Sequence, residues 1–475
     1  MNNNTLTRIG YTITNSSYSE SDIRTLLNQG ISFIYVRERN LNNDEIKKLF
    51  EIAKKFKKDI PLLYEPNTYS IGTRNITEEI SLQKGDKVTL LFEPKKDASS
   101  DKKSKTKKND DKEIFIEVTY PDIHRDLTTN TRLIIENTEY DFIVKKIVEK
   151  RVECICQKSC SIDRNTFFVI PTIQETISTK LGENLQMISK LNFALKTGYD
   201  YIVIQDLDLL QFLGTDNDSI KKRVLLKSNS TSNYASKSEV HSAVSGLVLV
   251  HDDLNITIDE INTPQSEETN INIYRSSGKP IFLYSNIVPD QIMSEIELSN
   301  IVSILKKRVD GIILPNGINP MELELIVQLI KNFEQDVKPD YIAIPRTASI
   351  ETDTLCYYGA KIAYDLRLKG VAVITNSGRT TQSITRHRLP LPIWSFSEKK
   401  KLSIKLGTHY GVKSFSIEDI PPDRDSTARI MLEKIYEQGE VSINDRILII
   451  FGSRIEHKKQ NTIIEIMNIS DLLSK

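Results

Sequence analysis

The chain has 475 residues and a mass of 54.3 kDa, which indicates about three domains at roughly 150 residues each. Its 64 basic and 64 acidic residues give a formal charge of +0, so no overall field attracts nucleic acid or an anionic membrane surface. No run approaches the ~20 apolar residues of a membrane span, and residues 1–4 lack the features of a signal peptide. We expect a cytoplasmic protein with no nucleic-acid or membrane partner.

Short apolar runs alternate with amphipathic helical patterns such as 21–28 and 320–333, which is typical of βα units and a parallel sheet. We predict strands at 7–13, 31–36, 61–64, 201–204, 223–226, 246–250, 280–284 and 311–314. Strands of this number, separated by helices, favour a (β/α)8 barrel, whose chemistry lies at the carboxyl ends of the strands.

Alternating apolar and polar residues at 87–92, 114–118 and 131–136 predict an antiparallel β insert. Within it, residues 95–113 have almost no apolar side chains, so we predict a disordered loop. Its lysines also fit a nucleic-acid arm, although its acidic residues offset them.

After about residue 338 a new α/β pattern begins, with strands predicted at 341–344, 370–374 and 446–451. A helix is predicted over 351–368, with Leu355, Ile362 and Leu366 on one face. The expected fold is a TIM barrel over 1–74 and 168–337, a small inserted β-barrel domain over 75–167, and a C-terminal α/β domain over 338–475.

Three of the four cysteines, Cys154, Cys156 and Cys160, lie in one short stretch. A zinc site normally has four ligands, and the next cysteine is Cys356. Ordinary reduced thiols fit this spacing better than a metal site.

A polar loop follows the predicted strand 370–374 and precedes a helical stretch. It consists of Thr375, Asn376, Ser377, Gly378, Arg379 and Thr380. Hydroxyls, a permissive glycine, backbone amides and an arginine fork together bind phosphate oxygens. A plain strand-to-helix turn is the alternative, since such a turn needs only the glycine.

The order of barrel, β insert and C-terminal domain with a Ser-Gly-Arg loop resembles pyruvate kinase. The resemblance rests on residues 7–13, 246–258, 278–280, 370–394 and 461–463. It implies a cytoplasmic glycolytic phosphotransferase that uses Mg²⁺ and K⁺ and assembles as a tetramer. It also implies that Thr375 to Thr380, with Arg454, bind a phosphorylated effector.

Several positions depart from the family pattern. The resemblance places the essential lysine at Leu209 and the two metal carboxylates at Asn229 and Asp253, with Asp252 beside the latter as a weak substitute. Lys227 and Ser285 are retained as remnants of the catalytic set. Replacing a carboxylate by an amide weakens a site for a hard cation such as Mg²⁺.

The phosphate-binding positions also differ. The second strand ends in Tyr35, Arg37 and Arg39, and the third in Glu65-Pro66, with Arg74 nearby. Arg37, Arg39 and Arg74 remain candidates for holding a small anion.

We therefore expect a catalytically impaired chain, a pseudoenzyme, that forms a homo- or hetero-tetramer with a catalytic paralogue and regulates or stabilises it. The alternative is an active, divergent pyruvate kinase that transfers phosphoryl from phosphoenolpyruvate to ADP and uses Asp252, Asp253, Ser285 and a displaced arginine in a rebuilt site.

Overall fold

The computed structural model describes the chain in separate stretches and divides into two compact units. One unit comprises Met1–Glu65 with Leu191–Lys475, and the other comprises Pro66–Lys190. The described residues are 5–14, 18–38, 44, 47–48, 51, 60–66, 71–74, 76, 79–91, 114–118, 127–135, 140–148, 151–162, 166–169, 190–191, 193–194, 196–205, 220–229, 235, 237–250, 264–285, 287, 289, 294–344, 350–421, 423–452 and 462–470.

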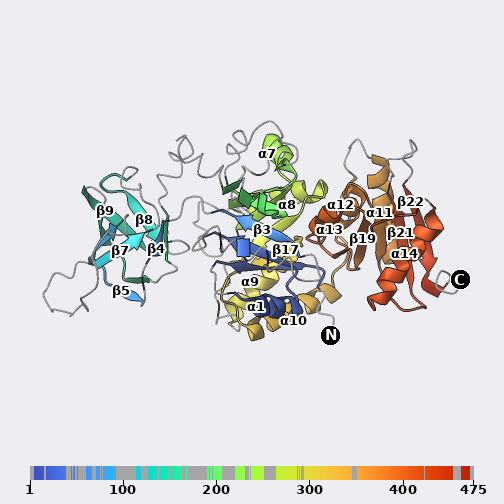
Figure 1. Cartoon of the computed structure of the whole chain (residues 1–475), viewed down its shortest axis with the longest axis horizontal. Helices are drawn as coiled ribbons and strands as arrows, with labels where there is room; N and C mark the ends of the chain where they lie inside the picture. The colour runs from blue at the N-terminus through green and yellow to red at the C-terminus, as the bar shows by residue number, and fades with distance from the viewer. Residues whose placement is uncertain are drawn as a thin grey trace. The chain divides into compact units, whose positions relative to one another are not determined.

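Eight parallel strands of the first unit close into a barrel in the order β1-β17-β16-β15-β14-β13-β3-β2 (Figure 1). They are β1 (Arg8–Ile13), β2 (Phe33–Arg37), β3 (Leu62–Glu65), β13 (Tyr201–Ile204), β14 (Val224–Asn229), β15 (Gly246–Val250), β16 (Ile281–Tyr284) and β17 (Gly311–Leu314). The described helices of this part are α1 (Glu20–Asn28), α7 (Ser238–Ala243), α8 (Pro264–Ser276), α9 (Glu295–Lys306) and α10 (Pro320–Gln335). The prediction of a (β/α)8 barrel is confirmed.

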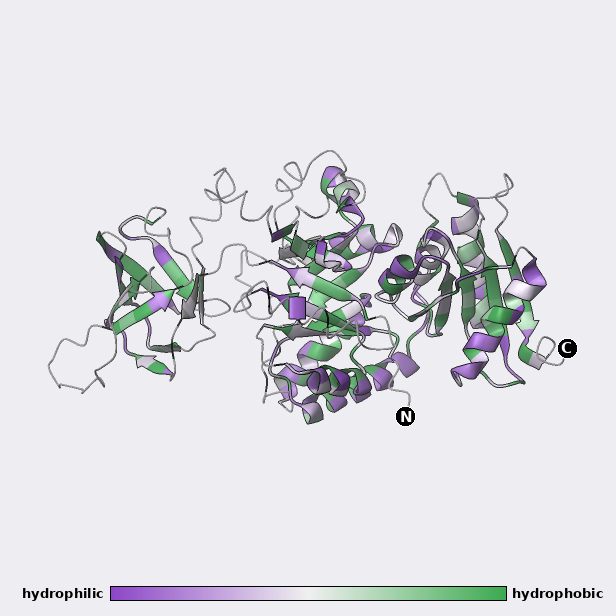
Figure 2. Ribbon diagram, in the orientation of Figure 1, coloured by the Kyte–Doolittle hydropathy of each residue, from purple (hydrophilic) through white to green (hydrophobic). Residues whose placement is uncertain are grey.

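Helix α10 illustrates how the sequence sets these elements. Pro320 occupies its first turn, and Asn319 and Glu322 form a capping box that satisfies backbone amides at the helix start. Leu323, Val327 and Ile330 recur at helical spacing and are buried. Figure 2 shows many hydrophilic residues on the helices that Figure 1 labels α1 and α10, and apolar residues along the barrel strands.

The second unit is also a closed barrel, in the order β10-β6-β7-β4-β12-β8-β9, with a separate pair β11-β5. Its strands are β4 (Ile71–Arg74), β5 (Ile80–Leu82), β6 (Lys87–Leu91), β7 (Ile114–Val118), β8 (Arg132–Ile135), β9 (Asp141–Val148), β10 (Arg151–Cys156), β11 (Cys160–Ile162) and β12 (Phe167–Val169). This unit is wider than the expected 75–167, because β4 and β12 pair inside it.

Strands β6 and β7 are parallel, so the prediction of a wholly antiparallel insert is wrong at this pair. The chain between Leu91 and Ile114 is long enough for the crossover that a parallel pair requires. The predicted disordered loop 95–113 lies outside the described residues.

The cysteine trio lies in this second unit. Cys154 and Cys156 are buried in its core, and the Sγ atoms of Cys156 and Cys160 are 3.7 Å apart. Burial raises the pKa of the Cys160 thiol to about 12. No group of three metal-binding side chains occurs among the described residues.

The C-terminal part of the first unit has its own five-stranded sheet, in the order β20-β19-β18-β21-β22. Its strands are β18 (Val371–Ile374), β19 (Ile393–Ser397), β20 (Val412–Ser416), β21 (Arg446–Phe451) and β22 (Ile463–Asn468), and its helices are α11 (Ile350–Asp365), α12 (Arg379–Thr385), α13 (Lys400–Leu406) and α14 (Arg424–Glu437). Only β22 runs antiparallel to its neighbour. The predicted C-terminal α/β fold is confirmed.

Helices cover both faces of this sheet, so its strands are apolar on both sides. One face packs on α14 through residues such as Trp394 and Met431. The other face packs on α11, α12 and α13, through residues such as Val373 and Ala360.

The strand predictions for this part are wrong at one place and incomplete at another. Residues 341–344 form no strand, and Ile342 instead donates its backbone N–H to Nδ1 of His387 at 3.3 Å. The sheet also continues beyond the strand predicted at 446–451, since β22 pairs along β21. Among the described residues, no helix is both long and apolar enough to cross a membrane.

Candidate active site and effector loop

Charged side chains meet inside the barrel at its carboxyl-terminal end. Glu65, the last residue of β3, accepts a hydrogen bond from Nζ of Lys227 at 2.6 Å and forms an ion pair with Nε of Arg37 at 2.9 Å. Arg37 ends β2, and Lys227 lies in the second half of β14. Because side chains alternate along a strand, these residues follow the inward-facing Tyr35, Leu63 and Leu225 of the barrel core.

Two tyrosines complete this group. The Tyr35 hydroxyl donates to Glu65 at 2.8 Å, and the Tyr284 ring lies 5.1 Å from the Lys227 ammonium and 5.7 Å from the Arg37 guanidinium. We call Tyr35, Arg37, Glu65, Lys227 and Tyr284 the barrel cluster. It is a layer of polar contacts placed on top of an apolar barrel interior.

Electrostatics keep the Glu65 carboxyl ionised. Burial alone would raise its pKa, but the charges of Arg37 and Lys227 and the hydrogen bonds from Lys227 and Tyr35 lower it to about 2. The same burial, together with the Glu65 charge, raises the pKa of Tyr35 well above its usual value. The cluster therefore contains one carboxylate and two cations at neutral pH.

The barrel thus contains a buried lysine that the sequence comparison treated only as a remnant. The expectation placed the essential lysine at Leu209, which lies outside the described residues. Lys227 comes from β14 instead, and its side chain is only 6% exposed. The sequence did contain a signal for this residue. Lys227 directly follows the apolar run 224–226 and lies two positions after Leu225, so it shares the inward face of the strand.

Ser285 follows β16 and is fully buried. Its hydroxyl accepts a hydrogen bond from the backbone N–H of Ile287 at 3.2 Å, and its own N–H donates to Ile313 at 3.0 Å. Another carboxylate, that of Glu38, is buried and accepts a hydrogen bond from the Tyr64 hydroxyl at 2.7 Å. Because side chains alternate along a strand, Tyr64 faces away from the barrel interior that Glu65 faces.

Several predicted site residues cannot be placed in this geometry. Arg39, Leu209, Asp252, Asp253 and Arg454 lie outside the described residues. For Arg74 and Asn229 the structure describes the backbone, in β4 and β14, but not the side chain.

The described residues do not assemble the oxygen ligands that Mg²⁺ requires. Glu65 is the carboxylate nearest the barrel cations, and two of these cations and a tyrosine already bind its oxygens. Glu38 is bound by Tyr64. No triad of potential metal ligands is found in the described stretches.

The predicted effector loop follows β18 at the carboxyl end of the C-terminal sheet. Strand β18 lies between β19 and β21, and the chain passes to one side for β19 and β20 and to the other for β21. Ligands of open α/β sheets bind where the strand order reverses in this way, beyond the carboxyl ends of the strands. The loop is therefore at the expected position for a ligand site.

Two glycines shape this position. Gly378 has a φ of 86°, a conformation that favours glycine, and it directly precedes α12. Gly452, which follows β21, would place a Cβ 2.7 Å from the carbonyl oxygen of Ile374 and 2.7 Å from Oγ1 of Thr380. The loops after β18 and β21 thus approach each other closely.

Side chains within the loop engage two of its backbone amides. The Gly378 N–H donates to Oγ1 of Thr375 at 3.0 Å, and the Arg379 N–H donates to Oγ of Ser377 at 3.4 Å. The Arg379 guanidinium forms an ion pair with Asp353 at 3.4 Å. These contacts within the loop stabilise its conformation, while Ser377 remains exposed.

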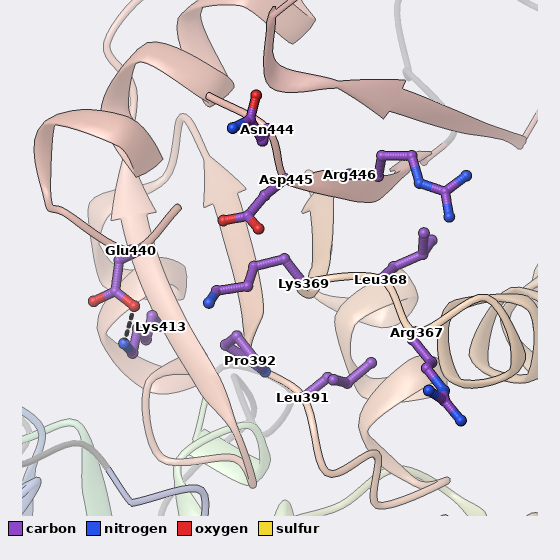
Figure 3. Close-up of a pocket in the computed structure, with 10 residues that line it drawn as sticks. All are labelled: Arg367, Leu368, Lys369, Leu391, Pro392, Lys413, Glu440, Asn444, Asp445 and Arg446. Atoms are coloured by element: carbon purple, nitrogen blue, oxygen red, sulfur yellow. Dashed lines mark hydrogen bonds and ion pairs between the residues drawn. The ribbon is translucent and has the colours of Figure 1, made fainter. Parts of the chain in front are cut away.

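A separate cavity of about 610 Å³ opens at the opposite, amino-terminal edge of the same sheet (Figure 3). Lys369, Lys413 and Arg446 line it, but so do the carboxylates of Glu440 and Asp445. Lys413 is paired with Glu440, as the dashed line in Figure 3 marks. This cavity contains none of the predicted effector residues.

Comparison with known proteins identifies similar chains. A family model described as the pyruvate kinase alpha/beta domain matches residues 353–467. The pyruvate kinase of Borreliella burgdorferi is 19% identical over 98% of this chain and 98% of its own length. Those of Staphylococcus epidermidis and Geobacillus stearothermophilus are each 20% identical over 99% of this chain and 81% of their own length.

A solved structure gives the same picture of the fold. Cryptosporidium parvum pyruvate kinase in complex with ADP superposes with a TM-score of 0.74 and is 15% identical, covering 98% of this chain and 96% of that one. The similarity extends over nearly the whole length of both proteins.

Proposed function

Because this chain belongs to the pyruvate kinase family, we propose that it is a catalytically impaired subunit that assembles with a catalytic pyruvate kinase and regulates or stabilises it. We place its action in the cytoplasm, within a homo- or hetero-tetramer. In this proposal the barrel site is weakened for catalysis, whereas the C-terminal loop keeps the groups that bind an effector.

The observation that carries the proposal is the charge balance of the barrel cluster. Arg37 and Lys227 carry two positive charges, and Glu65 binds both. The cluster therefore keeps one net positive charge, and both of its cations are already bound to a carboxylate of the protein. Phosphoryl transfer from phosphoenolpyruvate demands cations that face three charged oxygens, and here the cations face a carboxylate of the protein.

The expected loss is large. Removing one preorganised donor from a site of this kind lowers the rate by about 10²–10³-fold. The family's arginine position holds Tyr35, whose hydroxyl is bound to Glu65, and its metal carboxylate position holds Asn229. We therefore expect the isolated chain to be at least about 100-fold slower than the ~1–100 s⁻¹ that is typical of kinases.

The C-terminal loop supports the regulatory half of the proposal. Thr375 to Thr380 lie at the switch point of the sheet, where a phosphorylated effector is expected to bind, with Arg454 contributing. An effector bound there changes the assembly only if it binds one state more tightly than another. The loop offers hydroxyls and a guanidinium for that purpose.

A coupled assay tests this function. The purified chain is given phosphoenolpyruvate, ADP, Mg²⁺ and K⁺, and pyruvate is followed by its reduction with NADH and lactate dehydrogenase. We expect no turnover above that of the Lys227→Met variant, whose Glu65 keeps its pairing with Arg37. Turnover in the range of ordinary kinases, abolished in the Lys227→Met variant, refutes the proposed impairment.

The second candidate function is that of an active, divergent pyruvate kinase. The position of Lys227 favours it, since a buried ammonium at the carboxyl end of the barrel is a suitable group for stabilising an enolate. Ser285 would act beside the substrate, and Asp252 and Asp253 would hold Mg²⁺. The Lys227→Met comparison in the same assay separates the two candidates.

A further inference from the structure

A second polar cavity lies where the barrel meets the C-terminal part of the first unit. It has a volume of about 340 Å³, which suffices for a small phosphorylated molecule. Its polar lining comes from α7 and α8 on the barrel side and from α12 and the residue that ends it on the other. These residues are His241, Ser276, Ser277, Arg379, Gln382, Ser383 and Arg386.

The C-terminal wall of this cavity carries an excess of positive charge. Asp353 binds the guanidinium of Arg386 at 2.9 Å and that of Arg379 at 3.4 Å, so two cations face one carboxylate and leave one net positive charge. The Ser383 hydroxyl also donates to Asp353, at 2.6 Å.

Arg386 has hydrogen-bonding capacity that the protein does not use. Its side chain is only 4% exposed, and its Nε atom is buried without a hydrogen-bond partner. An unsatisfied buried donor on a charged group is costly, and an oxyanion in the cavity would satisfy it. A guanidinium fork matches the geometry of phosphate oxygens.

The barrel wall supplies uncharged polar groups, the Ser276 and Ser277 hydroxyls, which donate to the carbonyl oxygens of Ile273 and Tyr274, each at 2.8 Å. Nε2 of His241 lies 3.0 Å from Oγ of Ser277, and the Ser276 hydroxyl lies nearby on α8. Burial and the neighbouring Lys279 charge lower the pKa of His241 to about 4, so its imidazole is neutral at pH 7. The residues that line this wall include no carboxylate, so the wall adds no negative charge. The Lys279 ammonium donates to the carbonyl oxygens of His241 and Val244.

We propose that this cavity binds the phosphate group of a small phosphorylated metabolite, or inorganic phosphate itself, between Arg386 and Arg379 on one wall and His241 and Ser277 on the other. The site is distinct from the loop residues Thr375 to Ser377, none of which lines it. It requires no catalytic activity and does not depend on the proposed subunit role.

Occupation of this site links the barrel to the C-terminal sheet. The two walls already touch, since a Cβ on Gly278 would lie 2.8 Å from the carbonyl oxygen of Gln382 in α12. A bound phosphate would bridge the end of α8 to α12 and stabilise the junction by mass action. Arg379 belongs both to this cavity and to the effector loop, so ligands at the two places act on one side chain.

Isothermal titration of the full chain with inorganic phosphate tests the proposal. We expect Arg386→Gln to weaken phosphate binding by about tenfold or more, because it removes a charge-assisted hydrogen bond. Asp353 retains Arg379 and Ser383 in that variant, but folding is checked by circular dichroism. Ser277→Ala and His241→Gln, on the opposite wall, are expected to weaken binding several-fold without disturbing Asp353.

The control is Ser377→Ala, which changes the effector loop and is expected to leave this phosphate affinity unchanged. A phosphomonoester, glycerol 3-phosphate, is titrated in parallel: tighter binding than that of inorganic phosphate identifies a metabolite as the ligand, and equal binding identifies phosphate. The proposal is overturned if the barrel-wall variants and Arg386→Gln bind phosphate like the wild type. It is also overturned if Ser377→Ala alone abolishes binding, or if acetate competes as well as phosphate does.

Discussion

At the scale of residues, the barrel cluster depends on one carboxylate. Glu65 binds Lys227 and Arg37, and its side chain is 7% exposed. In such buried networks the attraction between charges offsets the loss of hydration only while all partners are present. The cluster is therefore more sensitive to the loss of Glu65 than to the loss of either cation, each of which leaves an ion pair intact.

We predict that Glu65→Gln lowers the free energy of unfolding by about 3–5 kcal/mol at pH 7, because two buried cations lose their counter-charge. The pKa of Glu65 is lowered from 4.5 to about 2 by folding. Its carboxylate therefore stabilises the native state above about pH 4.5, and this stabilisation is lost as the pH falls toward about 2. Urea unfolding between pH 7 and pH 3 measures both effects.

The matched control is Glu433→Gln, which breaks an exposed pair with Arg429 on α14. We expect this variant to lose less than about 1 kcal/mol. If Glu65→Gln is as stable as Glu433→Gln, and has the same acid profile as the wild type, the cluster does not hold the charges described.

A second buried ion pair joins the barrel to the C-terminal part of the chain. Arg388, just after α12, donates to both carboxylate oxygens of Asp310, at 3.1 and 2.6 Å, and Asp310 directly precedes β17. Both side chains are 2% exposed. Asp310 also accepts hydrogen bonds from the backbone N–H groups of Ile281 and Tyr410.

We predict that Arg388→Met destabilises the protein by about 3–5 kcal/mol, since it leaves the Asp310 charge buried without its cation. Arg429→Met, in an exposed pair, is expected to cost less than about 1 kcal/mol. Chemical denaturation followed by Trp394 fluorescence and circular dichroism compares the two. Equal midpoints would contradict the role given to the Arg388 contact.

At the scale of elements, the apolar runs of the sequence predicted every strand of the large barrel to within a few residues. A strand buried on both faces needs a continuous apolar run, and such runs are conspicuous. The run at 341–344 met the same criterion but is only partly buried, and its backbone at Ile342 bonds His387 instead of a strand. Whether a short apolar run forms a strand depends on which other strand lies beside it in the fold, and the local sequence does not specify that neighbour.

Helix α11 shows a different limit of prediction from the sequence. The predicted apolar face is only partly buried: Leu355 and Ile362 are half-buried, with Ile362 packed against the edge of the core, and Leu366 is 43% exposed. The buried stripe consists of Cys356, Gly359, Ala360 and Ala363, which pack against the sheet. A Cβ on Gly359 would lie 3.2 Å from Leu448 and Ile464, so small residues permit the close approach that bulky ones would prevent. Ranking residues by hydrophobicity missed this stripe.

The close approach of the loops after β18 and β21 leads to a prediction about the effector loop. We expect Gly452→Ala to weaken the binding of a phosphorylated effector at this loop by at least about tenfold, because the new methyl group meets Ile374 and Thr380 and moves the two loops apart. Binding is measured by titration calorimetry.

Gly439→Ala is the control, since Gly439 lies outside the loop and a Cβ there meets nothing within 4 Å. Its φ of 68° makes an alanine there strained, so this variant shows the effect of a general loss of stability without a steric clash between the loops. Equal affinity of the Gly452→Ala variant and the wild type would show that the effector does not bind between these loops.

At the scale of the whole molecule, the order of barrel, insert and C-terminal sheet followed from the sequence, whereas the contacts within the sites did not. Lys227 and Glu65 are 162 positions apart and meet only because the barrel closes. An alignment of single positions assigned the lysine role to Leu209 and did not reveal this ion pair. The loop after β18 was easier to locate from the sequence, because its residues are contiguous and its position follows from one strand and one glycine; its role in effector binding stays a prediction.

The central claim, an impaired subunit that acts on a catalytic partner, concerns the assembled protein. It is tested most directly by titrating the chain into a fixed amount of a catalytic pyruvate kinase from the same cell while pyruvate formation is recorded. We predict that the chain alone gives no turnover above the Lys227→Met variant, and that the rate of the mixture changes until it saturates at a fixed ratio of the two chains. Turnover by the chain alone at ~1–100 s⁻¹, or a mixture whose rate is unchanged at every ratio, would contradict the claim.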